Sequence, residues 1–203
     1  MILSSIELMI ATKAPPFSRA GWIFELKYDG YRALANKDQL LTRNKKDAST
    51  WYPEILQSLQ KVRGSFVIDG EVCLLDEKGI PQFEAMRGTT TRKRGGPPVT
   101  YFAFDLLFLN GRDLRSLPLI ERKERLRKLI PAQHPRLRFV DYLEERGEFM
   151  YQHAMQIGME GVVGKRADSR YVGGQSRNWL KSKPAGLHDG WKRRRQADQS
   201  TRP

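Results

Sequence analysis

Residues 25–32 read Glu-Leu-Lys-Tyr-Asp-Gly-Tyr-Arg, and the interpretation of the whole chain starts from this stretch. Lys27 closes a strand-like run that begins at Trp22, and the Asp-Gly step after it is typical of a tight turn. A lysine amine can act as a covalent nucleophile when burial or neighbouring positive charge lowers its pKa. The Lys-x-Asp-Gly pattern alone fits a solvated hairpin turn equally well, so the downstream sequence must decide between the two.

Basic residues dominate the charge of the chain. Its 203 residues include 36 lysines and arginines against 23 acidic residues, which gives a formal net charge of +13. Such an excess favours polyanionic partners, either nucleic acid or an anionic membrane surface. No apolar run approaches the roughly 20 residues that span a bilayer, so no membrane association is expected. Residues 1–11 contain Glu7 and no basic start, which indicates no signal peptide. With a single cysteine, Cys73, we expect a cytoplasmic protein near the nucleoid.

Alternating apolar and polar residues between turn signals predict a series of short strands. These strands cover residues 22–27, 31–36, 39–43, 65–75, 99–109, 137–140, 161–165 and 178–183. Helical periodicity predicts helices over residues 51–62, 82–87, 119–130 and 148–157. Hairpin-connected strands with helices between them favour an α+β fold of mainly antiparallel sheets, because a doubly wound parallel fold would alternate strand and helix more regularly.

The domain organisation is expected to be simple. Residues 1–185 should form one domain, in which residues 1–20 are an irregular leading segment. Residues 186–203 are polar and basic without apolar periodicity, and we expect them to be a disordered tail. The basic residues at 92–94 and 192–195 would supply sequence-independent contacts to phosphates.

Five downstream segments carry side chains that suit nucleotidyl transfer at Lys27. They are Arg43, Asp69-Gly70-Glu71, the aromatic strand 101–105, the strand-like stretch 160–166 and Trp179–Lys183. In this chemistry a neutral lysine attacks the α-phosphate of a nucleoside triphosphate, pyrophosphate leaves and a lysyl-nucleotide remains. Five cations are expected to lower the pKa of Lys27 and to offset the phosphate charge. These are Arg32, Arg43, Lys165, Lys181 and Lys183. Glu71 and Glu160 are expected to hold Mg²⁺ or Mn²⁺, because these ions prefer carboxylate and phosphate oxygens.

The ordered set of segments resembles the adenylation (nucleotidyltransferase) domain of ATP-dependent DNA ligases. It is most similar to the bacterial ligases of non-homologous end joining. The resemblance covers residues 8–184 and rests on several motifs and linking stretches. They lie at residues 27–32, 41–44, 69–71, 101–105, 117–123, 160–166 and 176–183. The resemblance implies a nucleotidyltransferase, ATP-grasp-like fold, with ATP bound in a pocket between its sheets.

The resemblance also implies a role for each matched residue. Lys27 would be the adenylated nucleophile, Glu25 would help to recognise the adenine, and Phe104 would stack on it. Contacts to the ribose and phosphate region would come from Arg32 and Arg43. The nucleotide and the metal would be served by Glu71 and Glu160. The α-phosphate would be contacted by Lys165, Lys181 and Lys183.

The implied substrate is nicked or broken duplex DNA. The resembled enzymes continue past the last lysine motif into an OB-fold domain, a fold suited to nucleic acid, whereas this sequence ends soon after Lys183. We therefore expect slow self-adenylation, or a separate OB-fold or end-joining partner protein. Two alternatives stay open. One is the same chemistry on RNA, by an RNA ligase or an mRNA-capping-type nucleotidyltransferase. The other is a truncated, non-catalytic module that binds nucleic acid or a repair partner.

Overall fold

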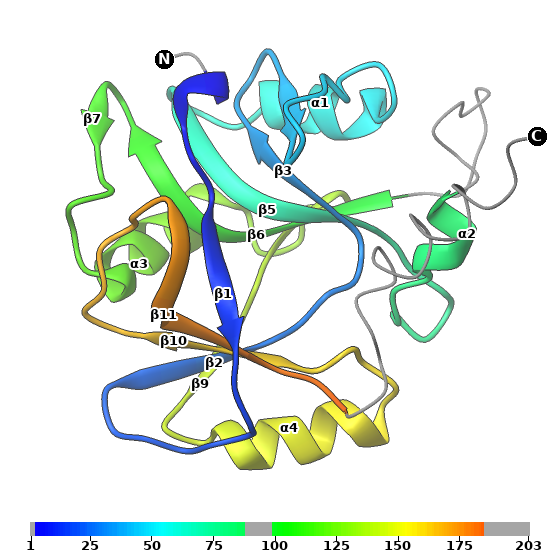
Figure 1. Cartoon of the computed structure of the whole chain (residues 1–203). Coiled ribbons are helices and arrows are strands. Elements are labelled where there is room, and N and C mark those ends of the chain that lie inside the picture. Colours follow the sequence, from blue (N-terminus) through cyan, green and yellow to red (C-terminus); the bar gives the residue numbers. More distant parts are fainter. Residues whose placement is uncertain (1–2, 88–98, 185–203) are drawn as a thin grey trace, which may run out of the picture.

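The computed structural model describes residues 3–87 and 99–184, which form two β-sheets with helices on their outer faces (Figure 1). The first sheet has the strand order β1-β11-β10-β2-β9. Its strands are β1 (Met9–Lys13), β2 (Trp22–Leu26), β9 (Tyr142–Glu144), β10 (Val162–Arg166) and β11 (Gly174–Ser182). The second sheet has the order β4-β3-β5-β6-β7, with β8 paired to β6. Its strands are β3 (Tyr31–Ala35), β4 (Leu40–Thr42), β5 (Phe66–Leu74), β6 (Val99–Leu109), β7 (Arg112–Asp113) and β8 (Leu137–Phe139).

The helices lie close to their expected positions. The described part of the chain contains a 3₁₀ turn, η1 (Leu3–Ser5), and the helices α1 (Pro53–Gln60), α2 (Phe83–Arg87), α3 (Leu119–Leu129) and α4 (Gly147–Gln156). None of these helices is long and apolar enough to cross a membrane. The expected α+β fold of mainly antiparallel sheets is confirmed, with two parallel exceptions at β1–β11 and β6–β8.

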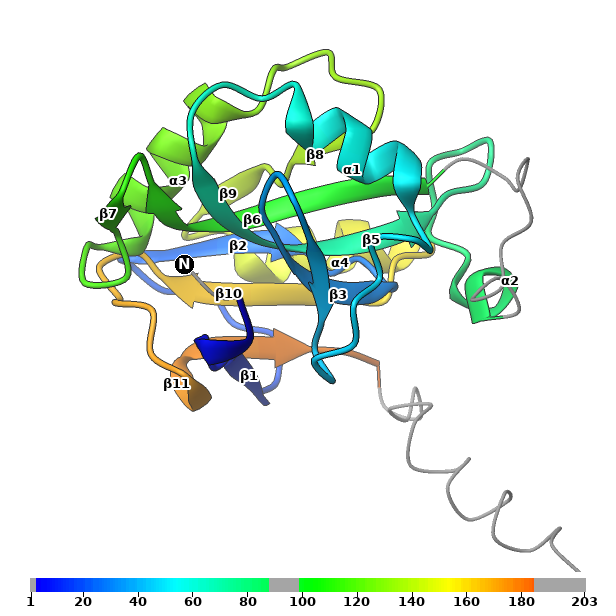
Figure 2. The same ribbon diagram turned by 90° about the horizontal axis from the view of Figure 1, so that it is seen from above.

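Alternation along the strands sorts the apolar side chains into three layers. Outside the second sheet, Ile55 and Leu59 of α1 pack with alternate residues of β3, β5 and β6; Figure 2 shows α1 beside these strands. Outside the first sheet, Phe24 of β2 packs with Met150 of α4. Between the two sheets, a third cluster joins Trp179 of β11 to residues of β1, β3 and β5. The polar residues of interest flank this middle layer.

Three short strands escape prediction. β1 lies in the leading segment that was expected to be irregular, and β7 and β9 are only two and three residues long. β1 gains its ladder from β11, with Met9 opposite Gly174, so its partner lies at the far end of the described chain. The expected basic loop at 92–94 and the tail 186–203 lie outside the described residues.

Candidate active site

Lys27 directly follows β2, and the strand sets the direction of its side chain. Phe24 packs beneath α4, so Glu25 and Lys27 project to the opposite face, toward the second sheet. The Lys27 backbone N–H donates to the Gly161 carbonyl oxygen at 2.9 Å. Gly161 has a φ of 150°, and a Cβ there would lie 2.1 Å from the Ser182 carbonyl oxygen, so the junction requires glycine. Backbone packing therefore fixes the origin of the Lys27 side chain.

One carboxylate connects two of the expected lysines. The Lys27 ammonium donates to Oε2 of Glu160, and the Lys183 ammonium donates to Oε1 of the same group. Burial alone would lower the pKa of Lys27, but the charges of Glu160 and Glu71 outweigh burial, so the pKa of Lys27 is raised. The expectation that neighbouring cations lower this pKa is wrong for the structure as it stands, because carboxylates dominate the surroundings of Lys27.

The carboxylates around Lys27 suit a divalent cation. Burial raises the pKa of Glu71 to about 7, against the lowering effect of Lys27 and Arg32. The pKa of Asp29 is also raised, by burial and by the charge of Glu160. Sequence reasoning treated Asp29 only as a turn residue. Within residues 3–87 and 99–184, no three metal-ligating side chains form a complete cage. Two carboxylates suffice for Mg²⁺, which takes its other ligands from water and phosphate.

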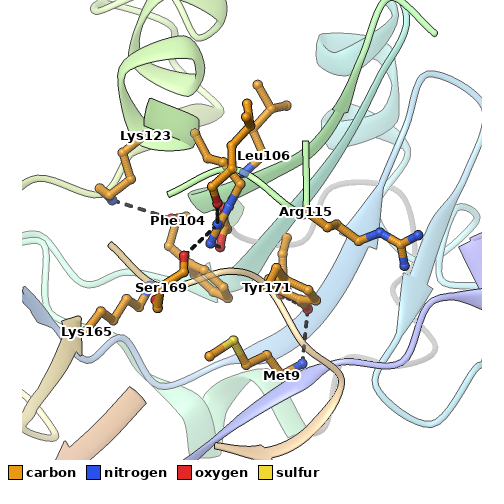
Figure 3. A network of polar contacts seen from close by, with 12 residues as sticks. Met9, Phe104, Leu106, Arg115, Lys123, Lys165, Ser169 and Tyr171 are labelled. Carbon is orange, nitrogen blue, oxygen red and sulfur yellow. Dashed lines mark hydrogen bonds and ion pairs between the residues drawn. The ribbon is translucent and has the colours of Figure 1, made fainter. Parts of the chain in front are cut away.

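The side chain of Arg32 is fixed in position by a neighbouring carboxylate, that of Asp69. Its guanidinium donates to both oxygens of Asp69, at 3.0 and 2.6 Å. Asp69 also accepts a hydrogen bond of 2.7 Å from the Tyr171 hydroxyl. The Tyr171 hydroxyl in turn accepts a hydrogen bond of 3.2 Å from the Met9 N–H, which Figure 3 shows. The Arg32 guanidinium lies 5.3 Å from the ring centroid of Phe104. The sequence interpretation placed Asp69 in a matched motif but gave it no role, and it missed Tyr171.

Glu25 and Phe104, which the resemblance assigns to adenine recognition, both lie beside Lys165. Lys165 is buried, with its ammonium 2.6 Å from Oε2 of Glu25 and 4.4 Å from the ring centroid of Phe104. The structure thus pairs Lys165 with the expected adenine-binding residues, whereas the sequence placed it at the α-phosphate. Lys123 of α3, which the sequence interpretation missed, lies 2.5 Å from Oε1 of Glu25.

Arg43 and Lys181 complete the expected set. The Arg43 side chain is exposed and lines a pocket of about 500 Å³ together with Glu7, Leu34 and Gly174. Its backbone N–H donates to the Arg32 carbonyl oxygen at 3.0 Å, which ties the end of β4 to β3. Lys181 is half-buried on β11 and pairs with Val163 of β10. The expected residues therefore form two clusters. Lys27 and Lys183 surround Glu160, and Lys165 lies at Glu25, while Arg43 lines a neighbouring pocket.

Comparison with known proteins gives this site a family. Residues 2–183 match the sequence model of the family described as ATP dependent DNA ligase domain. The chain belongs to this family. This chain is 36% identical to the multifunctional non-homologous end joining protein LigD of Pseudomonas aeruginosa, over 87% of the chain and 21% of that protein. It is 31% identical to the SPbeta prophage-derived DNA ligase-like protein LigB of Bacillus subtilis, over 82% of the chain and 62% of that protein.

Solved structures agree with the sequence relatives. This chain matches the crystal structure of the ligase domain of LigD from M. tuberculosis with a TM-score of 0.79 and 32% identity, over 90% of this chain and 62% of that one. A mycobacterial DNA ligase D complexed with ATP and MES matches with a TM-score of 0.77 and 31% identity, over the same shares of the two chains. The ligase domain thus has the expected nucleotidyltransferase fold and spans less than two thirds of these relatives.

Proposed function

We propose that Lys27 is the nucleophile of an ATP-dependent DNA ligase reaction. In the first step its amine nitrogen forms a bond to the α-phosphorus of ATP. The bond from that phosphorus to the bridging oxygen breaks, and pyrophosphate leaves with the electron pair. A 5′-phosphate of DNA then displaces Lys27 from the AMP, and a 3′-hydroxyl attacks the activated 5′-phosphate and releases AMP. The observation that carries this proposal is the Lys27–Glu160 pair at the glycine junction of β2 and β10.

The described residues divide the work of the first step. The Lys27 ammonium must lose a proton before it attacks, and Glu160 is the carboxylate that already accepts a hydrogen bond from it. Lys183 and Lys181 offset the charge of the phosphates. Arg32, fixed by Asp69, contacts the ribose and phosphate region. Glu25 and Phe104 receive the adenine.

Glu71 and Glu160 would hold a divalent cation, Mg²⁺ or Mn²⁺. The raised pKa of Glu71, to about 7, supports this, because a buried carboxyl group of this kind gains from an added positive charge. When bound, such a cation would neutralise charge on the triphosphate and help pyrophosphate to leave.

The polymer substrate is proposed on broader grounds. The net charge of +13 suits contacts to a nucleic-acid backbone, and the named relatives are DNA ligases and end-joining proteins. We propose nicked or broken duplex DNA as the substrate, residues 1–185 as the adenylation domain, and an OB-fold or end-joining protein as its partner.

A labelling experiment tests the nucleophile. The protein is incubated with Mg²⁺ and ATP labelled at the α-phosphate, then denatured and inspected for covalent label. Wild type and Lys78→Ala, which removes an exposed lysine, should carry label. Lys27→Ala should carry none, and chelation of the divalent cation should abolish the label of wild type and Lys78→Ala. Adenylated protein should then pass AMP to nicked DNA that has a 5′-phosphate.

Other outcomes would favour other functions. Covalent label from GTP alone would indicate a capping-type enzyme, and AMP transfer to RNA ends alone would indicate an RNA ligase. No label from either nucleotide, combined with salt-sensitive nucleic-acid binding, would contradict catalysis and leave a binding module.

A further inference from the structure

Lys123 is a buried cation for which the chemistry at Lys27 gives no use. It lies on α3, its side chain is fully buried, and its ammonium reaches three acceptors outside that helix. These are Glu25 Oε1 at 2.5 Å, the Val140 carbonyl oxygen at 3.0 Å and the Phe104 carbonyl oxygen at 3.4 Å. Figure 3 shows the side chain directed from α3 toward Phe104. One ammonium therefore ties α3 to β2 and β6.

Lys123 contacts the Glu25 carboxylate and the Phe104 backbone, and these are the two residues expected to meet the nucleobase. Glu25 lies on β2, two residues before Lys27, and both side chains project to the same side, so a nucleotide with its α-phosphate at Lys27 can extend its base toward Glu25. Phe104 projects from β6 into the same region, where it contacts Lys165 and Trp179. Lys123 approaches both Glu25 and Phe104 from behind, on the α3 side.

The Glu25 carboxylate keeps acceptor capacity after both lysines are bound. Lys123 takes Oε1 and Lys165 takes Oε2, whereas a carboxylate has about four lone-pair positions. Nearby, the buried Trp179 indole N–H has no hydrogen-bond acceptor among the described residues. The region thus offers acceptor positions and an unused donor. Adenine presents an amino donor at its 6-position and ring nitrogens as acceptors, whereas guanine presents a 6-carbonyl oxygen that a carboxylate would repel.

We propose that Lys123 is a positioning residue for nucleobase recognition, which orients Glu25 to accept a hydrogen bond from the 6-amino group of adenine. This inference rests on the proposed function, because it takes ATP as the nucleotide. Lys123 does not touch the nucleotide. It acts by fixing the rotamer of Glu25 and the backbone of Phe104, so its loss weakens recognition of the base and leaves the chemistry at Lys27 in place.

Charged groups on several elements face Lys123. They are Glu25 on β2, Lys165 on β10 and Asp105 on β6, and the rings of Phe139 and Tyr142 lie at 4.5 and 5.3 Å. Burial lowers the pKa of Lys123 to about 8, although Glu25 acts in the opposite direction. Lys123 is therefore charged at neutral pH and loses its charge under mildly alkaline conditions.

Nucleotide binding gives the first test. Dissociation constants are measured for ATP and for purine riboside triphosphate, which lacks only the 6-amino group, in a Lys27→Ala background that prevents covalent reaction. Without the variant at position 123, ATP should bind roughly 10-fold or more tightly than the analogue, as for a hydrogen bond to a charged group. Lys123→Met should bring this ratio close to one, while Lys123→Arg, which keeps the charge, should retain most of it.

Leu126→Ala separates positioning from simple loss of stability. Leu126 is fully buried on the same helix and packs in the cluster outside the second sheet, so its truncation destabilises the fold away from Glu25. Leu126→Ala should keep the ATP preference of the parent. A Lys123→Met protein that is folded and still prefers ATP as the parent does would overturn the inference.

Two further readouts complete the test. In covalent adenylation, Lys123→Met should raise KM for ATP about 10-fold and leave kcat nearly unchanged, as expected when base binding alone is weakened. If Lys123→Met does not fold, the parent itself serves: its ATP preference should fall between pH 7 and 9.5 as Lys123 loses its proton, and a constant ratio contradicts the inference. ATP preference without covalent label would reject the proposed function and keep the inference. A parent that binds neither nucleotide would reject both.

Discussion

At the scale of single residues, buried charge is the main feature of this molecule. Arg122 and Lys123 are adjacent on α3, and both side chains are fully buried. Each is paired with a carboxylate on a strand: Arg122 lies 2.8 Å from Asp105, and Lys123 lies 2.5 Å from Glu25, which it shares with Lys165. Buried ions of this kind persist only when they are paired and hydrogen-bonded, since removing one partner leaves an uncompensated charge.

The stability of the protein should report the titration of Lys123. The pKa of Lys123 is about 8 in the folded chain, whereas the ordinary value of 10.5 applies to the unfolded chain. At a pH between these two values, the unfolded chain therefore binds more protons than the folded chain. Stability therefore rises with pH in this window. Relative to Lys123→Met, wild type should gain about 2 kcal/mol in unfolding free energy between pH 7.5 and 10, by urea titration. Parallel pH profiles for the two proteins would contradict this prediction.

At the scale of elements, the entry of β10 is the sensitive point of the site. Gly161 separates Glu160 from β10, and its carbonyl oxygen accepts a hydrogen bond from the Lys27 N–H. A Cβ at Gly161 would collide with the Ser182 carbonyl oxygen at the end of β11. Three strands of the first sheet therefore converge on one residue without a side chain. This convergence sets the distance between Lys27, the proposed nucleophile, and the Glu160 carboxylate that accepts its hydrogen bond.

Gly161→Ala should damage both fold and site. The new Cβ must displace the backbone near Ser182, which should cost about 1–3 kcal/mol in unfolding free energy and slow covalent adenylation at Lys27. Gly158→Ala is the matched control, because Gly158 also has a positive φ, of 80°, but no atom lies within 4 Å of an added Cβ. It should lose about 1 kcal/mol or less and adenylate normally. Equal adenylation rates in the two variants would show that the Gly161 junction does not control the site.

At the scale of the whole molecule, the two sheets are joined through polar contacts as well as the shared apolar layer. Tyr171 precedes β11, yet its hydroxyl donates to Asp69 of β5 and accepts from the N–H of Met9 in β1. Through Asp69 the same network reaches Arg32 of β3. The placement of Arg32 therefore depends on the packing of one sheet against the other.

Tyr171→Phe should weaken this connection. It removes a buried hydroxyl and leaves the Met9 N–H and one Asp69 oxygen without that partner, so the unfolding free energy should fall by about 1–3 kcal/mol. Tyr151→Phe, at a half-buried position on α4, is the control and should change stability by less than about 0.5 kcal/mol. Chemical unfolding with unchanged slope measures both. Equal losses would mean that the Tyr171 hydroxyl adds nothing to the joint.

Local sequence pattern predicted most elements but not all. Strands such as β5 and β6 are long, apolar and bounded by turns, so their alternation is visible without a partner. β1 and β9 are short strands whose stability depends on pairing, and no local pattern marks them. One feature of the sequence could have revealed the buried cations of α3. Positions 119, 122, 123 and 126 form the buried stripe of α3, so Arg122 and Lys123 stand where apolar core residues are expected.

The sequence by itself determined the fold class and the family, and it singled out Lys27 as the proposed nucleophile, because spaced motifs and strand alternation are visible in the local order of residues. The tertiary structure decided which charges meet. It placed Lys165 and Lys123 on Glu25, and Lys27 and Lys183 on Glu160, so that carboxylates raise the pKa of Lys27. The physical reason is distance. Burial and Coulomb interactions depend on how far apart side chains lie in space, and residues distant in the chain become neighbours only when the two sheets pack.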